Sequence, residues 1–239
     1  SLRMPRDKEW ALTASVAGNK RTNRDWDIFD TGSTDAHIGL VRTYGKDVFS
    51  MALQHNQFWV DNDRYRTAVG FTAQWQHNYD ARNQASLYVQ YADLDYQSNQ
   101  QVRNADRFVI GANFAHALQG FKTVFYGGGY LAEEVAKRDA FPHLGHKAYG
   151  LRAGAQHEFH RDAKVFANIG YEHRDYGGQD PFFLKTRNEG QWNLGVGVAW
   201  TPAKNWRVTP QYQYTRVNSN ITLNDYNRQV LSFTVRRDF

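Results

Sequence analysis

Apolar and polar residues alternate with a period of two along almost the whole of this 239-residue chain. In the clearest run, Gln191 to Thr201, one face carries Trp192, Leu194, Val196, Val198 and Trp200. Successive side chains of a β-strand point to opposite faces of a sheet, whereas helical spacing of apolar residues is hard to find in this chain. The alternation therefore predicts an all-β protein whose strands have one apolar and one polar face.

Twelve such segments, mostly ten to thirteen residues long, follow one another along the chain. They lie near residues 9–18, 34–44, 47–59, 65–78, 84–95, 106–118, 121–135, 147–159, 163–175, 189–201, 205–218 and 227–239. Short connections, such as 45–46 and 161–162, alternate with longer polar ones, such as 19–33, 60–64 and 176–188. Short turns on one side and longer loops on the other are typical of an outer-membrane barrel.

A soluble β-sandwich or lipocalin-like barrel would also alternate, so segment length and side-chain chemistry must decide between the two classes. The segments match the length that spans a bilayer at a tilt, and soluble strands average five or six residues. Aromatic residues bracket the apolar faces, as in the girdles of membrane barrels. The predicted girdle residues are Trp10, Trp75, Tyr149, Phe159, Trp192, Trp200 and Trp206.

We therefore expect an antiparallel up-and-down transmembrane β-barrel of about 12 strands, forming one domain over residues 1–239 in the outer membrane of a Gram-negative bacterium. Outer-membrane lipid and lipopolysaccharide are then its expected surroundings. The chain start lacks the charged and apolar regions of a signal peptide. We expect either that a leader has been removed or that the chain is the C-terminal part of a longer protein.

Composition excludes several other classes of protein. Hydrophobic residues at 41% and aromatic residues at 15% exclude disorder, and no apolar stretch approaches the 18 residues of a membrane-spanning helix. Zero cysteines exclude a disulfide scaffold, a thiolate metal site and a cysteine nucleophile. The net charge of +5 is mild for this length and suits anionic lipid, an anionic solute or no particular partner. No nucleic-acid partner is expected, because the aromatic residues follow the apolar face and not the basic one.

Charged residues on the polar parity predict the lining of the lumen. They are Arg107, Arg152, Arg174, Arg207, Arg228 and Arg236, with Glu158 and Glu172. An arginine-rich wall lowers the entry cost for anions such as acidic sugars. The alternative is that arginine and glutamate pair across strands and fill the pore, with Glu158 near Arg152 and Glu172 near Arg174.

Catalytic and metal-binding interpretations have little support in the sequence. His77, His116 and His157 share the apolar parity near the ends of three segments, but no serine lies beside them on that face as a lipase would need. Asp139, His143 and His146 share one loop and offer a weak metal-site pattern. We expect girdle and loop residues instead, and therefore no enzyme, no metal and no cofactor.

The last segment ends with apolar residues at Leu231, Phe233 and Val235 and an aromatic residue at Phe239. This pattern resembles the terminal-strand signal of bacterial outer-membrane proteins. The resemblance implies that the barrel assembly machinery reads these four residues as an assembly signal.

A narrower resemblance covers roughly residues 120–239. It rests on the runs YGGQDPFF at 176–183, W-x-VTP at 206–210, NSNI at 218–221 and DYNR at 225–228, together with the terminal Phe239. These runs resemble the C-terminal barrel of tetratricopeptide-plus-barrel outer-membrane proteins, including the surface lipoprotein assembly modifier family. The resemblance implies an export or secretion conduit with a periplasmic tetratricopeptide domain or partner. A passive porin for small anionic sugars and a non-conducting structural or receptor barrel are the alternatives.

Overall fold

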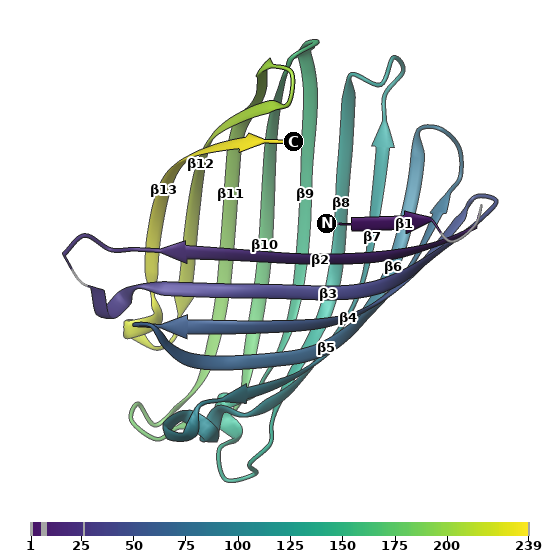
Figure 1. Ribbon diagram of the computed structural model, residues 1–239. Coiled ribbons are helices and arrows are strands. Elements are labelled where there is room, and N and C mark those ends of the chain that lie inside the picture. The colour runs from purple at the N-terminus through teal and green to yellow at the C-terminus, as the bar shows by residue number, and fades with distance from the viewer. Residues whose placement is uncertain (1, 6–8, 26, 239) are drawn as a thin grey trace. The chain divides into compact units, whose positions relative to one another are not determined.

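The computed structural model describes residues 2–5, 9–25 and 27–238, which form β-strands joined by turns and short 3-10 helices (Figure 1). The strands are β1 (Leu2–Pro5), β2 (Trp10–Arg21), β3 (Thr31–Tyr44), β4 (Asp47–Val60), β5 (Asp63–Asn78), β6 (Asn83–Tyr96), β7 (Ala105–Ala117), β8 (Thr123–Ala136), β9 (His146–His160), β10 (Ala163–Asp180), β11 (Lys185–Ala203), β12 (Trp206–Ser219) and β13 (Tyr226–Arg237). The helices are η1 (Asp27–Phe29), η2 (Ser98–Arg103), η3 (Pro142–Leu144) and η4 (Thr222–Asn224). None of these described helices has the length and apolar character needed to cross a bilayer.

The strands form one antiparallel sheet in chain order, from β1 to β13. The predicted up-and-down all-β fold is thus confirmed, and the twelve predicted segments correspond to β2 through β13. Strand β1 was not predicted, because four residues are too few to show a periodicity. It pairs with β2 from Leu2 opposite Ala14 to Pro5 opposite Ala11.

The chain divides into two compact units, which are described separately. Unit 1 comprises Ser1–His77, Ser86–Gly111 and Ala132–Lys147, and unit 2 comprises Asn78–Ala85, Ala112–Leu131 and Ala148–Phe239. Strands β1 to β4 and all of β5 except Asn78 therefore belong to unit 1, and β10 to β13 belong to unit 2.

In unit 1 the register places large apolar side chains in rows on one face. Ile38 of β3 lies opposite Leu53 of β4, which lies opposite Phe71 of β5, and all three side chains are exposed. The neighbouring row on the other face holds His37 and Gln54. The two faces predicted from the alternation are therefore present in β2 to β5, which we call the apolar face and the polar face.

Unit 2 has the same division. Val196 of β11 lies opposite Tyr212 of β12, which lies opposite Leu231 of β13, and each of these side chains is exposed. On the other face, Gly195 lies opposite Gln213. In these rows large apolar side chains lie on one face, and a glycine and an amide side chain lie on the other.

Buried apolar side chains are few and small among the described residues. Alanine accounts for most of them, and the larger ones are Leu94, Val217 and Ile221. A soluble protein of this size hides its large apolar residues and rarely exposes a contiguous apolar patch of more than a few hundred Å². The apolar faces of both units therefore need an apolar environment outside the protein, as lipid provides.

Two connections differ from the prediction. The expected loop 60–64 is a tight hairpin, because Asp61 and Asn62 both adopt positive φ angles of 51° and 61°, which suit a two-residue turn. The expected loop 176–188 is mostly strand: β10 and β11 continue to Asp180 and Lys185 after a register shift between Asp175 and Gln179. The glycines at 177 and 178 lie within this shift, where an extra residue is easily accommodated.

Candidate functional site

The candidate site is the polar face of each unit, since a barrel in lipid has only this face for water and cargo. Aromatic rings lie over glycines of the adjacent strand there. A Cβ atom added at Gly154 of β9 would lie 2.5 Å from the Tyr126 ring of β8, and Gly111 and Tyr88 have the same relation between β7 and β6. Tyr130 over Gly150 and Phe166 over Gly197 repeat it. These rings therefore lie along the strands of the polar face.

A network of buried charge connects β10 and β11 on the polar face of unit 2. Glu189 is 3% exposed and accepts a hydrogen bond from Arg187 Nε at 2.7 Å, while Arg174 Nη1 lies 3.7 Å away. Arg187 also stacks 4.3 Å from the centre of the Tyr176 ring. A buried carboxylate is tolerated only when paired and hydrogen-bonded, and these two guanidinium groups meet that need.

Glu172 extends this network along β10. It forms an ion pair with Arg174 and accepts a hydrogen bond from the Tyr130 hydroxyl of β8. Tyr130 is one of the rings that lie over glycine, so the network and the ring contacts form one connected structure. Glu189, Arg187 and Tyr130 were missed in the sequence analysis. Glu189 has the polar parity in the predicted segment 189–201, and this parity could have identified it as a lumen residue.

The predicted pairing of Glu158 with Arg152 is absent. Both residues lie in β9 six positions apart, a separation of about 20 Å in a strand, which is too long for an ion pair. Glu158 instead pairs with Lys164 at 3.3 Å, and Arg152 donates to the Asn113 side chain at 2.7 Å. The other predicted pair, Glu172 with Arg174, is present.

The remaining predicted lumen arginines have different surroundings. Arg236 pairs with Asp238 at 2.6 Å and lies opposite Arg207 in the β12–β13 register. Within the described part of the chain, Arg107, Arg207 and Arg228 make no ion pair. All four side chains are exposed.

The polar face of unit 1 brings Ser15 and His37 together. Ser15 Oγ lies 2.9 Å from His37 Nδ1 across the β2–β3 pair. Among the described carboxylates, none bonds to the His37 ring to orient it, so the pair lacks the third group of a hydrolytic triad. His37 has the polar parity, unlike the histidines discussed from the sequence, and was not predicted as a site residue.

The predicted girdle residues lie on exposed positions. Exposure of their side chains ranges from 36% for Trp10 to 59% for Phe159, with Trp75, Tyr149, Trp192, Trp200 and Trp206 between these values. In unit 1, Trp75 Nε1 donates to Asp47 at 2.8 Å, and the Arg42 guanidinium lies 5.3 Å from the Trp10 ring. An aromatic ring with a polar group at its edge suits a membrane–water interface.

The histidines at strand ends bond to neighbouring strands. His77 contacts Asp47 at 2.8 Å, His116 contacts Asn83 at 2.7 Å and His157 contacts Thr123 at 2.8 Å. No group of three metal-ligating side chains occurs among the described residues, which include the loop that carries Asp139, His143 and His146.

The predicted assembly signal lies at the C-terminal strand. Leu231, Phe233 and Val235 are exposed on the apolar face of β13 and pair with β12. Phe239 lies outside the described residues.

Comparison with known proteins assigns the chain to a family. The model of the surface lipoprotein assembly modifier family matches residues 6–239. The chain belongs to this family. No curated protein matches the sequence.

Three solved structures are similar to this family member. A membrane protein from work on in-meso crystallization is 16% identical with a TM-score of 0.50, covering 96% of this chain and 83% of its own. The KdgM porin in complex with oligogalacturonate is 10% identical with a TM-score of 0.42, covering 95% and 99%. The translocator domain of the autotransporter NalP from Neisseria meningitidis is 12% identical with a TM-score of 0.37, covering 96% and 87%.

The family and the strand architecture together establish the predicted fold and location. The chain is an antiparallel up-and-down transmembrane β-barrel protein of the bacterial outer membrane. Its apolar faces accordingly face lipid.

Proposed function

We propose that this barrel acts as an export conduit that helps surface lipoproteins reach the outer face of the membrane. The observation that carries the proposal is the family match over residues 6–239, because the family is described by its action on surface lipoproteins. A barrel of about twelve strands is narrower than a folded domain, so the cargo would pass as an extended segment. A periplasmic tetratricopeptide domain or partner would present the cargo, and the barrel assembly machinery would insert the conduit.

The polar face suits an extended cargo chain. The Tyr126 and Phe166 rings lie over glycines, which keeps large side chains along the strands. The exposed amide group of Gln213 would exchange hydrogen bonds with a passing backbone. Glu172 and Glu189 are already paired with arginine, so they would add little net charge that holds cargo in place.

The test is the surface display of an epitope-tagged lipoprotein in cells with and without this chain. Whole-cell antibody binding should fall sharply without the chain, while the total lipoprotein measured by immunoblot stays constant. The conduit proposal requires a further result: a cargo stalled by a stably folded fusion should crosslink to a photoreactive residue placed at Gln213. Surface display that depends on the chain, without any crosslink to the polar face, would contradict passage through the barrel.

A passive channel for small anionic sugars is the second candidate. The exposed Arg207 lies directly opposite Arg236, which is paired with Asp238, so Arg207 is the cation that would attract an anion here. A channel predicts steady conductance in a planar bilayer with anion over cation preference, and that preference should fall in Arg207→Gln. A barrel that shows no conductance on its own fits the exporter. If there is no conductance and lipoprotein display is also normal in cells lacking the chain, a structural or receptor barrel is the remaining interpretation. We propose no catalytic role for any of these residues.

A further inference from the structure

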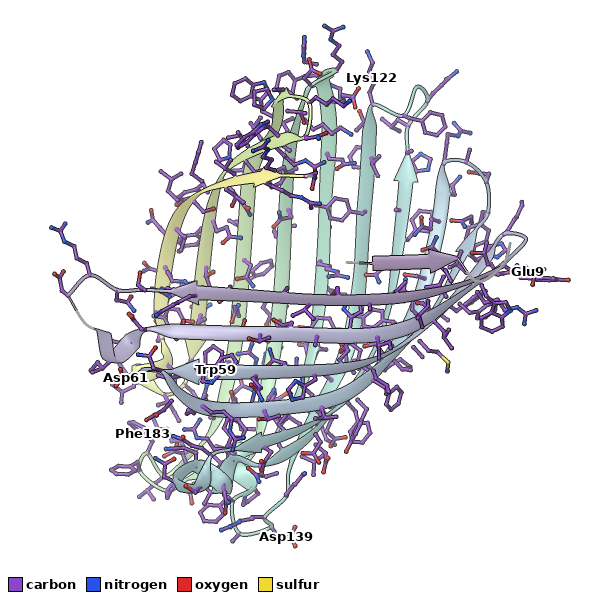
Figure 2. The ribbon with its side chains drawn as sticks, in the orientation of Figure 1. Glu9, Trp59, Asp61, Lys122, Asp139 and Phe183 are labelled. Carbon is purple, nitrogen blue, oxygen red and sulfur yellow. The ribbon has the colours of Figure 1, made fainter. Side chains whose placement is uncertain are left out.

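A depression of about 540 Å³, called the upper depression below, lies in unit 1 at the loop end of β2, β3 and β4. Lys20, Gly32 and Trp59 line it and lie directly opposite one another in the strand register, so they share one face. Lys20 and Gly18 point to the same side of β2 as Val16, which is exposed on the apolar face. The depression therefore opens on the lipid-facing side, at the edge of the sheet where β2 ends at Arg21 and β3 begins at Thr31. Figure 2 shows Trp59 close to Asp61 at this end of the β4–β5 hairpin.

Two glycines form the floor of the upper depression. A Cβ atom at Gly32 would lie 3.6 Å from the Asn19 carbonyl oxygen and 3.8 Å from the Trp59 ring, and one at Gly18 would lie 3.6 Å from the Ser33 carbonyl oxygen. The absence of side chains at 18 and 32 thus leaves backbone carbonyl groups and an indole ring accessible to a ligand. A sugar ring offers hydroxyl donors for such carbonyls and C–H groups for an aromatic surface.

The upper depression carries one cation, Lys20, and one carboxylate, Asp30. Lys20 is exposed and makes no ion pair with another described residue. Asp30 is the acidic residue of the lining, and its Oδ1 atom already accepts hydrogen bonds from the Asn23 backbone at 2.7 Å and side chain at 3.3 Å. The ammonium group of Lys20 is therefore available to a phosphate, while Asp30 is engaged by Asn23.

A second depression of about 610 Å³ lies further along the same strands and on the same face. Its lining is mostly apolar: Ala14, Ile38 and Leu53 form one row across β2, β3 and β4, and Val16 and Ala36 begin the next row. Ser15, His37 and Gln54, of the opposite parity, complete the lining between these rows. His55 lies opposite Ala36 and is the residue of this lining with a polar side chain on the apolar face. Four residues of strand, about 13 Å, separate Val16 in the second depression from Lys20 in the upper one. This spacing puts the second depression at hydrocarbon depth and the upper depression at headgroup depth.

We propose that the two depressions together bind one glycolipid of the outer leaflet that carries a phosphorylated sugar headgroup. The sugar stacks on Trp59 over the glycine floor, and its phosphate contacts Lys20. An acyl chain lies in the alanine-floored depression, where His55 donates a hydrogen bond to an acyl carbonyl group. The upper depression explains why an amphiphile is favoured over a plain acyl chain. The second depression explains why a lipid is favoured over a free sugar phosphate.

The experiment measures binding to the full chain in detergent micelles by native mass spectrometry, with purified lipid A as the probe. Phosphatidylglycerol tests for charge without sugar, and soluble glucosamine 1-phosphate tests for a headgroup without acyl chains. The variants are Lys20→Gln, Trp59→Leu and Gly32→Leu, and the matched control is Trp75→Leu at the other end of β5. Trp59→Leu and Trp75→Leu remove the same kind of side chain from opposite ends of the β4–β5 strand pair.

Lipid A should bind more tightly than both other probes. Its affinity should fall about tenfold in Trp59→Leu and Gly32→Leu and stay unchanged in Trp75→Leu. Lys20→Gln, an exposed position that leaves the strands intact, should remove the preference for bisphosphorylated over monophosphorylated lipid A. Equal binding of phosphatidylglycerol would overturn the sugar contact, and equal binding of glucosamine 1-phosphate would overturn the lipid. Unchanged affinity in folded Gly32→Leu would overturn the site itself.

Discussion

The ring contacts on the polar face make one substitution unusually informative. In Gly154→Ala, the new methyl group would lie 2.5 Å from the Tyr126 ring, about 1 Å inside van der Waals contact. The ring must either be overpacked or leave the strand, and we expect a loss of about 1–3 kcal/mol in the free energy of unfolding. Gly170→Ala is the matched control, because its methyl group would meet the Leu151 carbonyl oxygen at an ordinary 3.7 Å.

The control should behave in the opposite way. Glycine inside a strand is destabilising by roughly 0.5–1 kcal/mol relative to alanine, so Gly170→Ala should be neutral or slightly stabilising. Urea unfolding in lipid vesicles, followed by tryptophan fluorescence, measures both variants. A double-mutant cycle with Tyr126→Ala completes the test, because the cost of Gly154→Ala should disappear once the ring is removed. Equal stability changes for both glycines, or a cost that persists without the ring, would refute the reasoning.

Three further predictions concern charge and depth. Glu189→Gln should lower the free energy of unfolding by about 2–4 kcal/mol in urea titrations, because it leaves two partly buried arginines without their shared carboxylate. Val196→Arg should cost about 2–4 kcal/mol in vesicle-based unfolding, while Gln213→Arg on the polar face should cost almost nothing. The pKa of Asp80, in the β5–β6 turn, lies below its ordinary value because the Asn83 side chain and backbone amides donate to its carboxylate. Its stabilising effect is therefore present above the ordinary aspartate pKa and lost as the pH falls through the lowered value, so the stability difference between wild type and Asp80→Asn should shrink over that acidic range.

Strand positions were predictable because alternation is a local property of the sequence. Strands β2 to β13 fall on the predicted segments, and side-chain parity assigned Leu194 and Arg174 to their faces. Parity fails where a strand is irregular or very short. The register shift between Asp175 and Gln179 and the four-residue strand β1 are the two examples.

Pairing between strands was predictable only in part, because register depends on contacts between distant segments. Glu172 and Arg174 lie two positions apart in one strand, so their pairing could be read from the sequence. The contact of Ser15 with His37 depends on the β2–β3 register, which alternation does not specify. Tyr126 over Gly154 depends in the same way on how β8 meets β9.

The central claim is that lipid covers the apolar face and water covers the polar face. The chain contains no cysteine, so single cysteines along β11 from Gln191 to Trp200 can carry a nitroxide label without background. In reconstituted membranes, collision with oxygen should be high at Trp192, Leu194, Val196 and Val198, and collision with a water-soluble nickel complex should be high at the intervening positions. A uniform profile, or alternation of the opposite phase, would contradict the account.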